Sequence, residues 1–406
     1  AAALMILPER EFGQKEHLSI ICALPLLLLA GARSEAAAVS RGSALAAGIL
    51  GGIGIAFKPH FALVGLAVEA VVQLRARRPR PSLFRLENMA VLAVGIVYLG
   101  SVTLFAPAYW GFARAWAGLY HQFLHVDPLL SLVFGPPLFL LFAIPAALGL
   151  RRIAPAHTRP VEVLVVACLG YYVAAVMQHK GGLGYRFLPA VVTAYGGLWW
   201  LLLHAEAVPR SAVRRLYFGL ATVAVTLLPI LSIVRVIRRG PLEADPLYRG
   251  LPEAVAWARS HAASGPVLVL STHIGTAFPL VYLADVRLAS RHPHLWQLAA
   301  LYDRELWESD PPIVVRRPQG RGPLEQALID QVVEDMARHR PALIVVPPVH
   351  EDWWGAAGSR WFDYLSYFGS DPRFAREFAG FRRTHVIGEY VFYVRSSSSD
   401  EARGVK

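Results

Sequence analysis

Charge is scarce in this chain. Of its 406 residues, 17% are Asp, Glu, Lys or Arg, whereas a soluble domain contains about 25%. Hydrophobic residues make up 55% of the sequence, and the mean hydropathy is +0.42. This composition argues against a purely water-soluble protein and favours a protein that spans a membrane.

Cysteine and the common nucleotide motifs are also lacking. The two cysteines, Cys22 and Cys168, both lie in apolar runs, which excludes a disulfide framework and a thiolate metal site. No G-x-S-x-G, P-loop or G-x-G-x-x-G motif is present. Hydrolase, NTPase and dinucleotide-binding functions therefore have little support.

Long apolar runs are abundant. Eight of them have about the length of a membrane span, at residues 17–33, 42–57, 60–74, 88–106, 129–149, 162–178, 186–204 and 213–237. They predict a polytopic α-helical membrane domain over residues 1–239 with about eight transmembrane helices. The chain opens on Ala-Ala-Ala-Leu-Met, which resembles the tail of an earlier span, so we expect further spans upstream.

Basic residues gather in three loops between these runs. They are Arg75, Arg77, Arg78, Arg80 and Arg85 after the third run, Arg151, Arg152 and Arg159 after the fifth, and Arg210, Arg214 and Arg215 before the eighth. The positive-inside rule places these loops in the cytoplasm of a bacterial inner membrane. The net charge of +11 is then explained by loops that meet membrane lipids, and we expect no nucleic-acid partner.

The composition changes after residue 239 to that of a water-soluble domain. Residues 267–271 and 342–346 predict buried strands, residues 323–338 a helix, and residues 384–395 a hairpin that turns at Gly388 and Glu389. We expect a C-terminal α/β domain over residues 240–396, extracytoplasmic by the alternation of spans. Residues 397–406 form a Ser-rich, charged tail that we expect to be disordered.

Four polar clusters lie at span ends that the same topology places on the extracytoplasmic face. The first precedes a span and contains Glu11 and Glu16. The second, Lys58 and His60, separates two runs with hardly any loop, and ionisable residues at the edge of a membrane are costly unless paired or functional. A solvated loop and a snorkelling lysine are the plainer interpretations.

The third cluster lies at residues 107–128, and the fourth joins two spans at residues 178–186. The third contains Tyr120, His121 and His125, for which an interfacial aromatic belt on an amphipathic helix is the plainer interpretation. It lacks a third metal ligand and an H-E-x-x-H motif, so we predict no metal residues, although a divalent metal cofactor stays open. The fourth cluster offers glycines and the cations that bind phosphate, His179, Lys180 and Arg186.

Together these clusters provide carboxylates, cations and aromatic rings on one face. This set suits group transfer from a lipid-linked phosphate. Cations stabilise the departing phosphate, while a carboxylate, Glu11 or Glu16, deprotonates an acceptor hydroxyl. Tyr120, His121 and His125 are our candidates for contact with the sugar or acceptor.

Three short motifs add a resemblance to a known family. They are Glu11-Phe-Gly-Gln-Lys-Glu-His17, Ala56-Phe-Lys-Pro-His60 and His179-Lys-Gly-Gly-Leu-Gly-Tyr185. With these motifs the chain resembles the GT-C glycosyltransferase superfamily, of the dolichyl-phosphate-mannose protein mannosyltransferase type. The resemblance implies a polyprenyl-phosphate sugar donor and an extracytoplasmic active site. By location it makes Lys58, His60, His179, Lys180 and Arg186 ligands of the donor phosphate.

The family's usual catalytic acid follows its first span, in a loop that we expect to precede this sequence. It is therefore assigned to no residue here, and Glu11 and Glu16 stay candidates from their own chemistry. The acceptor would be a glycan, lipid or protein of the cell envelope. The alternative is a non-enzymatic subunit or scaffold of a larger membrane complex. A transporter has less support, because the spans are poor in mid-span charge and in inverted repeats.

The α/β domain has polar segments of its own. Residues 271–273 follow a predicted strand, where ligands usually bind in open α/β sheets, and residues 290–294 and 351–354 are further candidates. We expect this domain to shape access of the acceptor.

Overall fold

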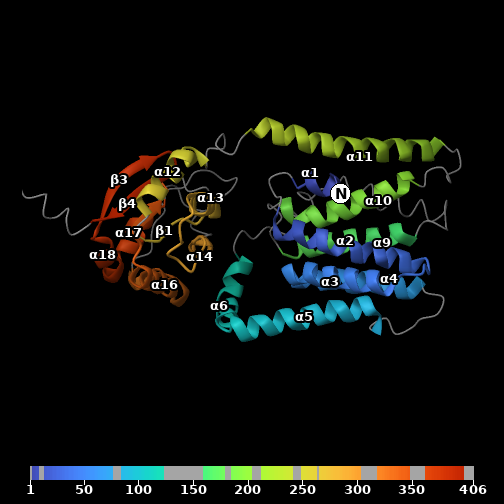
Figure 1. Cartoon of the computed structure of the whole chain (residues 1–406), viewed down its shortest axis with the longest axis horizontal. Helices are drawn as coiled ribbons and strands as arrows, with labels where there is room; N and C mark the ends of the chain where they lie inside the picture. The colour runs from blue at the N-terminus through green and yellow to red at the C-terminus, as the bar shows by residue number, and fades with distance from the viewer. Residues whose placement is uncertain are drawn as a thin grey trace, which may run out of the picture. The chain divides into compact units, whose positions relative to one another are not determined.

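The computed structural model describes residues 2–8, 13–75, 84–122, 159–178, 184–203, 212–240, 248–262, 265–302, 318–347 and 362–396. The chain divides into two compact units (Figure 1). The helical unit comprises Ala1–Gly111 and His125–Arg238, and the α/β unit comprises Phe112–Leu124 and Arg239–Lys406.

The helical unit consists of helices alone among its described residues. They are α1 (Ala2–Ile6), α2 (Lys15–Ser34), α3 (Arg41–Phe57), η2 (Pro59–Phe61), α4 (Ala62–Arg75), α5 (Leu86–Phe105), α9 (Arg159–Val176), η4 (Gly184–Phe187), α10 (Leu188–Leu203) and α11 (Ala212–Arg239), while α6 (Ala108–Gln122) begins here and continues into the α/β unit. Seven of the described helices match a predicted apolar run to within about three residues: α2, α3, α4, α5, α9, α10 and α11. The run at 129–149 lies outside the described residues.

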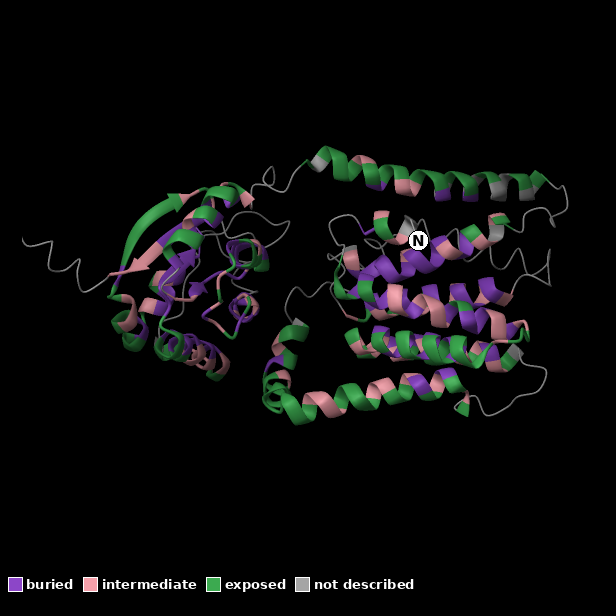
Figure 2. Cartoon of the chain, in the orientation of Figure 1, coloured by how far each residue is buried: buried purple, intermediate pink, exposed green. Residues whose placement is uncertain are grey.

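Among the described residues, four helices are long and apolar enough to cross a membrane: α2, α5, α9 and the Ala221–Arg238 part of α11. Helix α3 and the Pro59–Leu74 segment are apolar but shorter. These features are those of a helical membrane protein, and the total of about eight spans stays a prediction. About half of the residues of α2 and α9 are buried within the unit, whereas few residues of α5 and α11 are (Figure 2).

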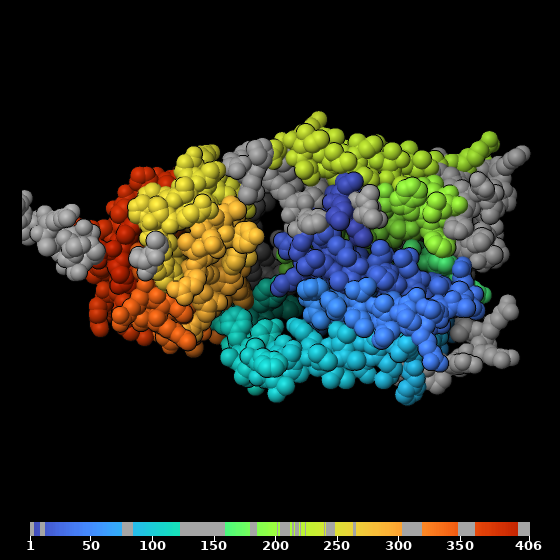
Figure 3. Space-filling model, in the orientation of Figure 1, coloured from blue at the N-terminus to red at the C-terminus, as the bar shows by residue number. Residues whose placement is uncertain are grey.

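Glycines allow α3 to approach its neighbours closely. A Cβ on Gly54 would lie 2.7 Å from the Ser19 carbonyl oxygen of α2, and one on Gly48 would lie 2.4 Å from the Glu87 carbonyl oxygen of α5. Small residues permit this backbone contact between membrane helices. The blue helices α2 and α3 accordingly pack without a gap in the space-filling view (Figure 3).

Basic residues meet at one end of the helical unit. Arg33 near the end of α2 pairs with Glu87 at the start of α5 at 3.0 Å, and Arg85 pairs with Glu69 of α4 at 3.1 Å. Arg159 at the start of α9 donates to the Ser34 carbonyl oxygen at 2.7 Å. This is the end for which the basic loops predict a cytoplasmic position.

The α/β unit contains a four-stranded sheet of order β1-β2-β4-β3. Its elements are α12 (Leu251–His261), β1 (Val267–Val269), α13 (Ile274–Ala284), α14 (Trp296–Leu301), η9 (Pro318–Gly320), α16 (Pro323–His339), β2 (Leu343–Val346), α17 (Tyr364–Gly369), α18 (Pro372–Phe378), β3 (Phe381–Ile387) and β4 (Tyr390–Arg395). Strands β1 and β2 are parallel, and β2–β4 and β3–β4 are antiparallel. The predicted strands, the long helix and the hairpin are confirmed.

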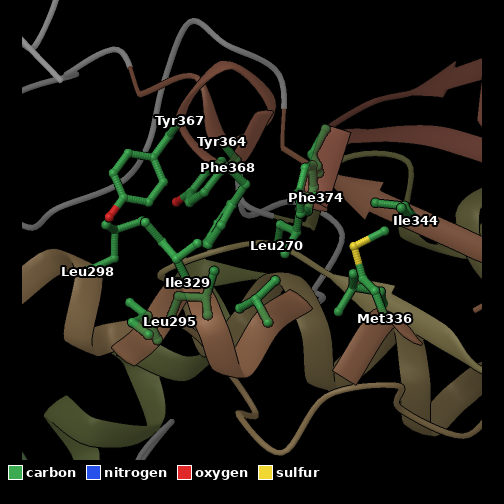
Figure 4. Packing of buried hydrophobic residues seen from close by; sticks show 14 of the residues in the cluster. Leu270, Leu295, Leu298, Ile329, Met336, Ile344, Tyr364, Tyr367, Phe368 and Phe374 are labelled. Atoms are coloured by element: carbon green, nitrogen blue, oxygen red, sulfur yellow. The ribbon is translucent and has the colours of Figure 1, made fainter. Parts of the chain in front are cut away.

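Alternate residues of the strands face opposite layers of helices. Leu268 and Ile344 join a core with α14, α16, α17 and α18, while Val269 and Val345 join a core with α12 and α13. The first core is rich in aromatic rings from α17 and α18, among them Tyr367, which pack over Ile329 and Met336 of α16 (Figure 4). Two buried faces explain why these strands read as continuous apolar runs.

Most of α6 belongs to the α/β unit. Trp116 is 3% exposed in its core, and its ring lies 6.3 Å from that of Trp296. The sequence places this segment with the membrane helices and begins the soluble domain at residue 240. The difference arises because the aromatic face of α6 finds partners in the α/β core, rather than serving only as an interfacial belt.

Candidate functional site

An ion pair lies at the end of the helical unit opposite the basic end. Glu16 is the second residue of α2, and Lys58 caps the C-terminus of α3. The Lys58 Nζ atom lies 2.7 Å from Glu16 Oε1, with the two side chains 16% and 2% exposed respectively. A buried carboxylate and ammonium compensate each other's charge, and neither is stable there alone.

Three hydrogen-bonded polar side chains lie at the same end of the helical unit. Arg186 of η4 is 3% exposed, and its guanidinium donates to Gln178 Oε1 at the end of α9. Gln178 Nε2 lies 3.1 Å from His60 Nε2. Because an amide nitrogen only donates, His60 accepts this bond through Nε2 and its neutral ring carries the proton on Nδ1.

The ion pair and the hydrogen-bonded side chains interact electrostatically and form one cluster. Lys58, Glu16 and Arg186 all act electrostatically on the His60 ring. We call Glu16, Lys58, His60, Gln178 and Arg186 the bundle-end cluster. One carboxylate against two cations leaves it with net positive charge, suited to an anion such as a phosphate.

The backbone around the cluster is fixed by buried hydrogen bonds. His17 is fully buried. Its Nδ1 accepts from the Gly13 amide at 3.0 Å, and its Nε2 donates to the Leu4 carbonyl oxygen at 2.8 Å. Ser19 Oγ donates to the Gly54 carbonyl oxygen at 2.7 Å. The His17 bonds hold the segment before α2 against its first turn, and the Ser19 bond holds α2 against α3. Together they set the position of the ion pair.

The structure therefore joins four of the predicted site residues: Glu16, Lys58, His60 and Arg186. Sequence reasoning gave no role to Gln178, which bridges two of them; its place beside His179 at a span end is the signal that could have found it. Glu11, His125, His179 and Lys180 lie outside the described residues. Their roles stay predictions.

Tyr120 and His121 belong to the α/β unit. The Tyr120 ring meets the Trp296 ring edge-on, with centroids 5.4 Å apart. Both residues are exposed on α6, and the structure does not join them to the bundle-end cluster. Their predicted role at a sugar or acceptor stays untested.

Histidines collect beyond the carboxyl end of β1. The Leu295 amide donates to the Ser271 carbonyl oxygen at 2.8 Å, which brings the predicted segments 271–273 and 290–294 together. Burial, with the nearby His273 and His292, lowers the pKa of His294 to about 4. His292 is held by Gln331 at 2.8 Å. His292 is thus satisfied, as a core histidine usually is, whereas the His294 Nδ1 atom is buried without a hydrogen-bond partner among the described residues.

Metal ligands are not assembled in the part of the chain that the structure describes. Within it, no group of three or more His, Cys, Asp or Glu side chains could hold a metal ion. The sequence matches no protein-family model and no curated protein.

Proposed function

We propose that the chain is a membrane glycosyltransferase. It would move a sugar from a polyprenyl-phosphate donor to a glycan, lipid or protein acceptor of the cell envelope, on the extracytoplasmic face of the bacterial inner membrane. The observation that carries this proposal is the bundle-end cluster, in which the buried Arg186 and the partly buried Lys58, paired with Glu16, lie at one end of an apolar helical unit.

The position of the cluster supports a lipid-linked substrate. Glu16 and Arg33 are 17 positions apart on α2, or about 25 Å along the helix. The basic end with Arg33 is cytoplasmic by the positive-inside rule, so the cluster faces the other side. A phosphate held there keeps its polyprenyl tail within the bilayer and its sugar at the water interface.

The contacts assign a role to each member of the cluster. Lys58 and Arg186 stabilise the phosphate as its charge increases, and Gln178 holds Arg186 beside His60. Glu16 is a positioning residue in this proposal, because its carboxylate fixes the Lys58 ammonium at 2.7 Å. The sequence predicts Glu16 as a candidate general base. In this proposal it positions Lys58 instead, and Glu11 is then the candidate general base.

In the transfer step one bond to the sugar breaks and another forms. The bond from sugar C1 to the phosphate oxygen breaks, and its electron pair stays with the departing polyprenyl phosphate. A new bond forms from C1 to the acceptor oxygen, whose proton passes to the base. The cluster lowers the barrier by binding the phosphate more tightly as it gains charge.

A transfer assay on the full chain with polyprenyl-phosphate sugars tests the proposal. We expect Lys58→Ala to lower transfer by about 10²–10³-fold, the loss typical of one electrostatic donor, and to raise KM for the donor but not for the acceptor. Glu16→Gln should give a smaller loss of the same kind, since Lys58 stays present but less fixed.

Arg33→Ala is the matched control, because it breaks an ion pair of the same unit at the opposite end. It should change thermal stability and leave KM for the donor unaltered. Wild-type transfer by the folded Lys58→Ala protein would reject the site. If the wild-type chain transferred no sugar, the scaffold alternative would gain support.

A further inference from the structure

Helix α13 of the α/β unit is apolar on every side. Its sequence, IGTAFPLVYLA, contains no charged residue. Leu280 and Val281 are buried in the core, but the opposite face is open to solvent, with Ile274 48%, Phe278 42% and Tyr282 80% exposed. These three residues are four positions apart and so form one stripe. Helices that are hydrophobic all round are normally covered.

Basic side chains border the C-terminal end of this stripe. A surface groove there is lined by Arg259, Arg287 and one acidic residue, Asp285. Arg259 reaches across to α13, where its Nη2 donates to the Leu283 carbonyl oxygen at 2.6 Å. Leu283 is itself 46% exposed. An apolar, aromatic face with arginines at its edge is the composition of a surface that binds at the membrane interface.

The chain keeps this unit close to a bilayer. Helix α5 is a candidate membrane span that ends at Phe105. Ala106 and Pro107 alone separate it from α6, and an extended pair of residues reaches only about 7 Å. From Phe112 onward α6 is part of the α/β unit. A domain attached so closely to the end of a span stays beside the membrane surface.

The start of α13 lies on the side of the unit that α6 covers. Trp296 contacts both Trp116 and Tyr120 of α6. The neighbouring Leu295 donates to Ser271, three residues before α13 begins. Helix α6 and the N-terminus of α13 thus both lie beyond the carboxyl end of β1.

We infer that the exposed face of α13 is a docking surface for the bilayer itself. Phe278 and Tyr282 enter the interfacial region, and Arg259 and Arg287 contact phosphates of anionic phospholipids. The stripe is about 12 Å long, and its three side chains are far fewer than the roughly 20–30 residues that give a stable protein interface its area of about 800 Å² per partner. A membrane needs no such area, because the spans already hold the domain in place.

Lipid quenching of a fluorophore on the full chain tests this inference. Cys22 and Cys168 are replaced by Ala, and a Tyr282→Cys variant is labelled with a fluorophore and placed in nanodiscs that contain phosphatidylglycerol. Phospholipids with bromine near the headgroup then quench any label in the interface. A Val386→Cys variant is the matched control, since Val386 is an apolar residue of β3 that is 47% exposed.

We expect several-fold stronger bromolipid quenching of the label at 282 than at 386. Arg259→Gln with Arg287→Gln should lower the quenching at 282 in anionic nanodiscs to the level found with phosphatidylcholine alone. Equal quenching at the two positions would overturn the inference. So would a label at 282 that neither bromolipid nor aqueous iodide reaches, because a protein surface would then cover α13.

Discussion

Lys58 illustrates what a cation requires at the end of an apolar helical unit. Its ammonium has a carboxylate partner 42 positions away, Glu16, and the pair is closed at 2.7 Å with little exposure. Removing one partner of such a pair leaves an uncompensated charge, which is far more costly than the loss of a surface ion pair. In the proposed function the same pair also presents the Lys58 cation to the donor phosphate.

His294 gives a residue-scale prediction about pH. Its pKa of about 4 lies below the ordinary value of 6.5 because the ring is buried beside two other histidines. The unfolded chain therefore binds more protons between these values. Stability of the α/β unit is complete above about pH 6.5 and falls by on the order of 2 kcal/mol as the pH drops to about 4.

Hydrogen exchange of peptides from β1 and α14 measures this effect in the full chain, after correction for the intrinsic exchange rate at each pH. His294→Gln should flatten the dependence between pH 6.5 and 4, because glutamine binds no proton in either the folded or the unfolded chain. A variant with an unchanged pH profile would show that another group controls this region.

At the scale of elements, α3 is the helix most constrained by its neighbours. We expect Gly48→Ala to destabilise the helical unit by about 1–3 kcal/mol, the usual cost of overpacking, since the added Cβ meets the backbone of α5. Gly100→Ala is the control. It lies in α5 with nothing within 4 Å of the new Cβ, so the melting temperature in detergent should stay level or rise.

Equal melting temperatures for the two glycine variants would contradict the close contact of α3 and α5. The test separates the effect of helix propensity, which favours alanine in both variants, from the effect of contact, which differs between them.

Elements also differ in how far the sequence predicts them. Apolar runs give the bounds of α2, α3 and α5 to within two residues, because length and hydropathy are local properties. The place of α6 depends on the contact of Trp116 with Trp296, 180 positions further on. An aromatic segment at a span end is compatible with a membrane belt and with a domain core, and only the distant partner decides.

The sequence also predicts the candidate site only in part. Glu16, Lys58, His60 and Arg186 could be named from the cost of placing ionisable groups at a membrane edge. Their pairing could not, because it depends on how α2, α3 and α9 pack. Gln178 carries no charge and so gave no such signal, although it joins Arg186 to His60.

For the whole molecule, the two ends of the helical unit predict one orientation. In a background without Cys22 and Cys168, we expect Thr384→Cys on β3 to react with a membrane-impermeant thiol reagent added outside intact spheroplasts. Ala37→Cys, which follows α2 at the basic end, should react only after the membrane is opened. The reverse labelling pattern would contradict the extracytoplasmic assignment of the α/β unit and of the bundle-end cluster.

The ion pair of Glu16 and Lys58 also bears on how the chain enters its membrane. These residues stand at the two open ends of the hairpin made by α2 and α3. Its turn lies between Arg33, near the end of α2, and Arg41, the first residue of α3. In the proposed orientation both must cross the bilayer while the arginines stay behind. A closed ion pair exposes the lipid to no net charge as it crosses. Early packing of α2 against α3 along the glycines of α3 would therefore ease translocation of the polar end of the hairpin.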